Sequence, residues 1–590
     1  MRYIINCIKP RAFFSFAILL FALIACSGPD DANQSTQIVP TKLEADAKEV
    51  IAEESVAKSP NVLVIVVDDV GFNDLSIHGS EIQTPNIDKL MRDGVALTNF
   101  HVAPNCSPTR SMLMSGTDSH IAGLGGMAES LAPNQKGRSG YEGHLNFSVA
   151  ALPEVFQDAG YHTYMTGKWH LGLTEETSPA ARGFDKSFIL GQGGAGHFSN
   201  MLQLFGPAKA IYREDGKQLD SLPSDFYSTK FYTERMIEYI DSNHSDGKPF
   251  FSYLAYSAPH WPLQAPQESI AKYKGVYDEG YEVLKDKRLQ ALKNLGLVDK
   301  DTTVFPRYSD EPTWDSLSDE EKAYQARVME VYAAMIDDVD IYIGKLIDHL
   351  KAIGEYDNTF IFFTSDNGPE AHNLDEAWEG LAEYVASCCD NSYENIGNAN
   401  SYIWYGQNWG QAGNTPARMY KGFTSQGGIR VPAFAHYPKG IEKGVRSDEL
   451  LHVMDVMPTL LEFADISHPG SPYRDREVVG MKGHSMLSLL QGKTGSVHSD
   501  DRIIGWELFS KRAVRKGDWK ALYEPFHKVL EPRAVGIKTD TWQLYNLADD
   551  PVELNDLSEE KPEKLAEMIV HWNEYVEDTR LVLPDAWDGY

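Results

Sequence analysis

Four short strand-like runs, each leading to polar side chains, constrain the fold of this chain most. The first is a continuous apolar run from Val62 to Val67 that ends at Asp68 and Asp69. Such a run is typical of a strand buried on both faces of a parallel sheet. Three further runs behave alike: 161–166 leading to Lys168 and His170, 250–256 leading to His260, and 359–364 leading to Asp366 and Asn367.

Helical patterns lie between these runs. The clearest carries apolar residues at helical spacing from Val328 to Leu350, after a Ser318-x-x-Glu321 capping box and before Gly354. Alternating strands and helices predict an α/β fold, a doubly wound, mostly parallel sheet with helices on both faces. In such sheets the ligand crevice lies beyond the carboxyl ends of the strands, so we expect the polar strand ends to face one site.

After about residue 470 the pattern changes to short strands at 503–508, 519–523 and 542–547, followed by an acidic helical tail. We interpret this region as a smaller C-terminal α+β domain. For the whole chain we predict four segments: a signal peptide at 1–25, a flexible tether at 26–59, a catalytic domain at 60–468 and the C-terminal domain at 469–590.

The N-terminus predicts export. Arg2, Lys9 and Arg11 precede an apolar stretch at 12–25 that is short for a membrane span and typical of a signal peptide. Leu23-Ile24-Ala25-Cys26 resembles the bacterial lipobox, in which the cysteine carries lipid after cleavage; the alternative is an ordinary cleavage site with an incidental cysteine. Because no later segment is a long apolar run, we expect an exported bacterial lipoprotein, at the periplasm or cell surface, held on the membrane through Cys26 lipid alone.

Composition excludes two classes of protein. The chain has 85 Asp and Glu against 54 Lys and Arg, a net charge of −31, so it lacks the basic excess of a nucleic-acid-binding protein. Five cysteines in 590 residues do not form a disulfide framework. For Cys388-Cys389 we leave open a vicinal disulfide or two buried thiols, and the Trp378, Trp404 and Trp409 region either walls a pocket or packs.

Asp68, Asp69, Asp366 and Asn367 offer only oxygen ligands. Oxygen ligands suit a hard cation such as Ca²⁺ or Mg²⁺ and argue against zinc. Taken alone, each pair is equally consistent with a turn or a helix cap. Their position after two buried strands favours a metal site.

Cys106 lies just before Pro108, which suits the first turn of a helix, and Arg110 follows one turn later. A helix N-terminus with an arginine can bind an anion. The alternative for this cysteine is a small buried apolar side chain.

Cys106-Ser107-Pro108-Thr109-Arg110 resembles the Cys-x-Pro-x-Arg signature of type I sulfatases, whose cysteine is oxidised to Cα-formylglycine. Further matching strings run from Pro60 to about residue 465, and those after Arg110 and around Trp404 are similar to the bacterial arylsulfatase branch. They include Asp68-Asp69, Gly167-Lys168-Trp169-His170-Leu171-Gly172, Ala258-Pro259-His260, Ser365-Asp366-Asn367-Gly368, Tyr420-Lys421-Gly422 and Gly427-Gly428-Ile429-Arg430-Val431-Pro432. The family fold is alkaline-phosphatase-like.

The resemblance implies a mechanism. Residue 106 would be a formylglycine hydrate that attacks sulfur, beside one Ca²⁺, with Mg²⁺ less favoured. The ligands would be Asp68, Asp69, residue 106, Asp366 and Asn367. The remaining roles would be these: Asp366 takes the attacking proton, Arg110 and Lys168 orient the nucleophile and offset charge, His260 and Lys421 assist the leaving alcohol, and His170 deprotonates the second hydroxyl to expel sulfate.

We therefore expect an arylsulfatase that acts on small sulfate esters and is matured by a formylglycine-generating enzyme. Two alternatives stay open: a phosphonate monoester hydrolase or phosphodiesterase of the same superfamily, and a lipoprotein that binds sulfated glycan without turnover. For the single residues, His170 and His260 could be structural histidines, and Lys168 and Lys421 could be solvated lysines.

Overall fold

The structure of the chain is a computed structural model. The structure describes residues 59–306, 311–374, 380–493, 496–525 and 540–585. Some of the predicted features lie outside the described residues: the signal peptide, nearly all of the tether, Cys26 and Trp378. Among the helices within those ranges, none is long and apolar enough to cross a membrane.

The four predicted strands lie side by side in the centre of a ten-stranded sheet, in the order β9-β1-β8-β4. Their bounds are Asn61–Val67 for β1, His162–Lys168 for β4, Phe250–Ala255 for β8 and Thr359–Ser365 for β9. All three pairings are parallel. The carboxyl ends of the four strands therefore meet at one edge, as predicted.

Six further strands extend this sheet on both sides. On one side lie β10 (Ala433–His436), β2 (Val95–Leu97) and β11 (Val445–Ser447), and on the other β5 (Lys186–Leu190), β6 (Tyr212–Glu214) and β7 (Lys217–Gln218). Since β10, β6 and β7 pair antiparallel with their neighbours, the sheet is mostly parallel. A separate two-stranded pair joins β3 (Phe100–His101) to β12 (Leu451–His452).

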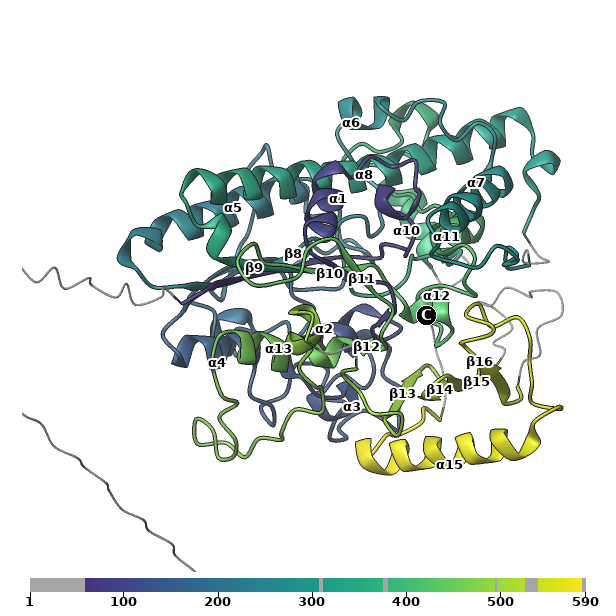
Figure 1. Ribbon diagram of the computed structural model, residues 1–590. Helices are drawn as coiled ribbons and strands as arrows, with labels where there is room; N and C mark the ends of the chain where they lie inside the picture. The colour runs from purple at the N-terminus through teal and green to yellow at the C-terminus, as the bar shows by residue number, and fades with distance from the viewer. Residues whose placement is uncertain (1–58, 307–310, 375–379, 494–495, 526–539, 586–590) are drawn as a thin grey trace, which may run out of the picture. The chain divides into compact units, whose positions relative to one another are not determined.

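Helices cover both faces of the sheet (Figure 1). One face carries α1 (Pro85–Arg92), α5 (Ser228–Asn243) and α8 (Asp319–Ala352), and the other carries α2 (Cys106–Ser115), α4 (Leu152–Asp158) and α13 (Val456–Phe463). Alternate residues of β1 enter the two cores: Leu63 and Ile65 pack into one, Val62 and Val64 into the other. This double burial explains the continuous apolar run.

Further helices lie elsewhere among the described residues. They are α3 (Ser119–Ala122), α6 (Gln267–Ala271), α7 (Tyr281–Asn294), α10 (Leu381–Cys388), α11 (Gly406–Asn414), α12 (Gln426–Ile429) and α14 (Leu487–Leu490). The predicted capping box of the long helix is present, because Ser318 Oγ accepts from Glu321 N and the Glu321 carboxylate accepts from Ser318 N. Gly354 follows that helix at φ +76°, a conformation that glycine adopts without strain.

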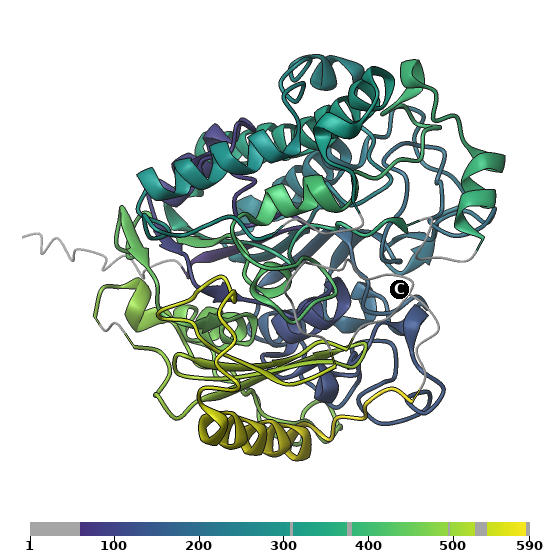
Figure 2. The same ribbon diagram turned by 90° about the vertical axis from the view of Figure 1, so that its right-hand side faces the viewer.

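The C-terminal part is a four-stranded antiparallel sheet with a helix on one face (Figures 1 and 2). Its strands are β13 (Ile503–Leu508), β14 (Lys511–Lys516), β15 (Trp519–Tyr523) and β16 (Gln543–Asn546), and its helix is α15 (Pro562–Thr579). The predicted α+β domain is confirmed, with β14 as an additional strand. The boundary at 468 stays a prediction.

Candidate active site

Pairing of β1 with β9 brings two acidic strand ends together. Val67 lies opposite Ser365, so Asp68 and Asp69 leave the sheet beside Asp366 and Asn367. Asp69 N donates to Asp366 Oδ1 at 3.3 Å, and Asn367 Nδ2 donates to Asp69 Oδ1 at 2.6 Å. All four side chains are buried. Asp69 has φ +66°, an unusual backbone conformation of the kind found at functional sites.

Cys106 is the first residue of α2, and its thiol faces this acidic cluster. Asn105 caps the helix, since its Oδ1 accepts from Cys106 N at 2.7 Å. Cys106 Sγ lies 3.5 Å from Asp68 Oδ1 and 4.0 Å from Asp69 Oδ1. One ligand atom each from Asp68, Asp69, Cys106 and Asp366 lies within 4.8 Å of the others. Burial and the neighbouring carboxylates raise the pKa of the thiol well above its ordinary value.

Two buried cations hold the carboxylates. Arg110 donates from Nε to Asp366 Oδ2 at 2.8 Å and from an Nη to Lys168 O at 2.8 Å. Lys168 Nζ lies 2.7 Å from Asp68 Oδ2. Burial raises the pKa of Asp68 to about 7 despite Lys168. For Asp366 burial acts in the same direction, but Arg110 and Lys168 outweigh it and hold the pKa below its ordinary value.

Lys421 lies on the other side of the cluster. Its Nζ is 3.0 Å from Asp69 Oδ1 and 3.2 Å from Glu370 Oε2. Glu370 also accepts from His372 Nδ1. Sequence reasoning missed Glu370, although it follows the Ser365-Asp366-Asn367-Gly368 string by two residues.

His260 is oriented by its own neighbour. Its Nδ1 lies 2.6 Å from Trp261 O, so Nδ1 carries a proton and Nε2 faces Asp69 Oδ2 at 3.8 Å. Burial, together with the positive charges of Lys421 and Lys168, lowers the pKa of His260 well below its usual value.

His170 is held by a residue that sequence reasoning missed. Its Nε2 lies 3.0 Å from Glu129 Oε1, and its buried Nδ1 has no hydrogen-bond partner among the described residues. Burial lowers the pKa of His170, and Glu129 opposes this shift. Glu129 is 41 residues away in the sequence, so no local pattern pointed to it.

Two adjacent glycines lie against these histidines. A Cβ at Gly193 would lie 2.7 Å from His170 Cε1, and a Cβ at Gly194 would lie 2.8 Å from His260 Cε1. Real Cβ atoms essentially never approach so closely, so a side chain at either position would displace the ring beside it. These positions need glycine because of a close approach.

The donor set suits a hard metal ion. Besides the carboxylates, Asn367 Oδ1 is buried and has no hydrogen-bond partner within the described ranges. An unpaired buried oxygen beside crowded carboxylates is the arrangement that an oxygen-ligated cation satisfies. The cluster could therefore hold a metal ion.

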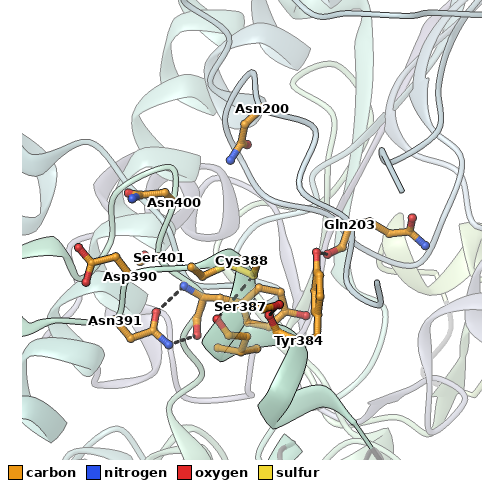
Figure 3. The surroundings of a disulfide bond; sticks show 12 residues. Asn200, Gln203, Tyr384, Ser387, Cys388, Asp390, Asn391, Asn400 and Ser401 are labelled. Atoms are coloured by element: carbon orange, nitrogen blue, oxygen red, sulfur yellow. Dashed lines mark hydrogen bonds between the residues drawn. A yellow bond between two sulfur atoms is a disulfide. The ribbon is translucent and has the colours of Figure 1, made fainter. Parts of the chain in front are cut away.

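Two regions left open by the sequence are now defined. Cys388 and Cys389 form a disulfide, so the alternative of two buried thiols is wrong (Figure 3). Trp409 is buried in edge-to-face contact with Tyr277, Tyr281 and Trp314, which is a packing role. Trp404 is only partly buried: it packs against the cluster of Trp261 and Tyr402, and it also lines a small cavity of about 100 Å³.

In this α/β fold a mostly parallel sheet presents a buried, oxygen-rich site at its carboxyl edge. Residues 60–466 match the family described as Sulfatase, and residues 418–580 match N-sulphoglucosamine sulphohydrolase, C-terminal. The chain belongs to the sulfatase family and is a sulfuric ester hydrolase.

Similar proteins cover most of the chain. An uncharacterized sulfatase of Schizosaccharomyces pombe is 47% identical over 90% of this chain and 96% of its own length. An arylsulfatase of Klebsiella aerogenes is 37% identical over 75% of this chain and 94% of its own. The solved structure of Ps i-CgsB with k-i-k-neocarrahexaose has a TM-score of 0.62 at 24% identity and covers 90% of this chain and 95% of that one, which shows the shared fold.

Proposed function

We propose that this chain is an arylsulfatase that hydrolyses aryl sulfate esters to a phenol and sulfate. The observation that carries the proposal is the position of Cys106, at a helix N-terminus with its Sγ 3.5 Å from the Asp68 carboxylate. The Klebsiella aerogenes relative, 37% identical and named an arylsulfatase, supports the choice of ester.

Asp68, Asp69, Asp366 and Asn367 would hold a Ca²⁺ ion, because they offer only oxygen ligands and Asn367 Oδ1 is unpaired. Formylglycine at position 106 would supply the nucleophilic oxygen, and the cation would polarise the sulfate oxygens.

Side chains of the protein itself would supply charge stabilisation and proton transfer. Arg110 and Lys168 place two positive charges beside position 106, where they offset negative charge on the sulfuryl oxygens. Asp366 accepts the proton of the attacking group. Its contact with Arg110 keeps this carboxylate ionised and therefore able to act as a base.

The two histidines differ in the nitrogen that is free. His260 points Nε2 into the site, where with Lys421 it assists the departing oxygen. His170 donates from Nε2 to Glu129, which leaves Nδ1 to accept a proton when sulfate is released.

Peptide mass spectrometry and turnover on one preparation test this proposal. We expect turnover of nitrophenyl sulfate to rise in proportion to the fraction of chains with formylglycine at position 106, and Cys106→Ala to abolish turnover while the chain stays folded. Full activity with only unmodified cysteine would refute the mechanism. Faster turnover of a phenylphosphonate monoester than of the sulfate would instead assign the chain to the phosphonate alternative.

We also propose that the chain is exported as a lipoprotein anchored through Cys26, on the basis of Leu23-Ile24-Ala25-Cys26. Cys26→Ala should abolish metabolic lipid labelling but leave turnover in detergent extracts unchanged. Persisting label would place the anchor at another residue.

A further inference from the structure

A cavity of about 450 Å³ lies between the ten-stranded sheet and the C-terminal sheet. Its lining includes Arg446 on β11, Arg430 just after α12 and Arg515 on β14. None of its lining residues belongs to the candidate active site. Arg430 ends the Gly427-to-Pro432 string that matched the family, and the proposed mechanism gives this arginine no role.

Among the described residues, no carboxylate is paired with any of the three guanidinium groups. Within the described ranges, none of them forms an ion pair at 4.0 Å or less, although Asp448 and Asp518 also line the cavity. Arg430 Nε donates to Thr98 O, Arg446 donates from one Nη to Leu295 O, and Arg515 Nε donates to Gly517 O. These contacts leave the Nη groups of Arg430 and Arg515 available to a ligand.

Two of these charges are substantially buried. Arg515 is only 6% exposed, and the guanidinium of Arg430 lies over the Phe72 ring at 4.3 Å from its centroid. Burial lowers the pKa of each to about 10; the charge of Arg515 contributes to this shift at Arg430, whereas Asp518 and Glu553 partly oppose it at Arg515. Buried arginines are normally paired, because an uncompensated charge away from water is costly.

We propose that this cavity binds a small organic ester bearing a tetrahedral oxyanion, sulfate or phosphate, with Arg430 and Arg515 on the anion. Arginine presents paired N–H donors that match such oxyanions. The volume lies within the range of small-molecule pockets and exceeds what the anion alone needs. Asp448 and Asp518 lie where they can accept hydrogen bonds from hydroxyl groups of the organic part.

Equilibrium binding of glucose 6-sulfate, glucose 6-phosphate and glucose tests the proposal, using the full chain with Asp366→Ala so that no probe is hydrolysed. We expect one of the two esters to bind, glucose not to bind, and Arg515→Gln to weaken binding about tenfold or more. The ester that binds more tightly identifies the anion. Arg512→Gln, on the same strand but outside the cavity lining, is the matched control.

Arg446→Gln provides a second variant if Arg515→Gln does not fold, because Arg446 is exposed at the rim. Arg446→Gln removes one of the three positive charges that line the cavity, so it should also weaken ester binding. In the enzyme that retains Asp366, the same substitution should leave the turnover of nitrophenyl sulfate unchanged. Equal affinity in all variants, or equal loss in Arg512→Gln, would overturn the proposal. Because the readout is binding without turnover, failure of the arylsulfatase assignment would leave this result unaffected.

Discussion

The buried His120 contacts the C-terminal domain, and its ionic contacts predict how the stability of the protein depends on pH. Its Nδ1 lies 2.8 Å from Asp118 Oδ1, and its Nε2 lies 3.4 Å from Glu507 Oε2 on β13. Tyr575 of α15 donates to Asp118 Oδ2 at 3.0 Å. Burial opposes a charge on His120, but the contacts with Asp118 and Glu507 outweigh burial and raise its pKa to about 9.

This pKa predicts how stability changes with pH. An unfolded histidine titrates near pH 6.5, so the shift corresponds to about 3 kcal/mol of folding free energy. Because the folded-state pKa is the higher one, this contribution is complete below pH 6.5. It disappears as the pH rises through about 9.

Urea unfolding of the parent chain and of His120→Gln, followed by circular dichroism from pH 6 to 10, measures this contribution. We expect the difference in unfolding free energy between the two proteins to shrink by about 3 kcal/mol across that range. His78→Gln is the matched control, because burial lowers the pKa of His78 to about 4 and leaves it neutral throughout the range. A difference between parent and His120→Gln that does not change with pH would refute the reasoning.

Three further predictions concern the active site. Gly194→Ala should lower kcat/KM for nitrophenyl sulfate about 100-fold, because the new Cβ displaces His260. The control Gly480→Ala, whose Cβ meets nothing within 4 Å, should leave kcat/KM unchanged. Equal kcat/KM values for the two variants would contradict this prediction. Removing metal with a chelator should lower both turnover and Tm, and Ca²⁺ should restore them; unchanged values in metal-free protein would rule out the metal site. His260→Ala should steepen the dependence of kcat/KM on leaving-group pKa across substituted aryl sulfates, since poorer leaving groups need more help; equal slopes would assign His260 to binding or support instead.

The sequence by itself determined the centre of the fold. A strand buried on both faces, such as β1, must be apolar at every position, so its pattern is visible without a structure. The same holds for the capping box of α8, where Ser318 and Glu321 satisfy backbone groups only three residues apart. Parallel strands end at a common edge, so convergence of the polar strand ends also followed.

Only the tertiary structure decided what surrounds those groups. Glu129 reaches His170 from 41 residues away, and Gly194 approaches His260 through packing that no periodicity encodes. Likewise, Arg430 and Arg515 line one cavity although 85 residues separate them, because two sheets meet there. Local patterns report which residues are buried and which backbone groups are satisfied nearby; partners distant in sequence are set by how the layers pack.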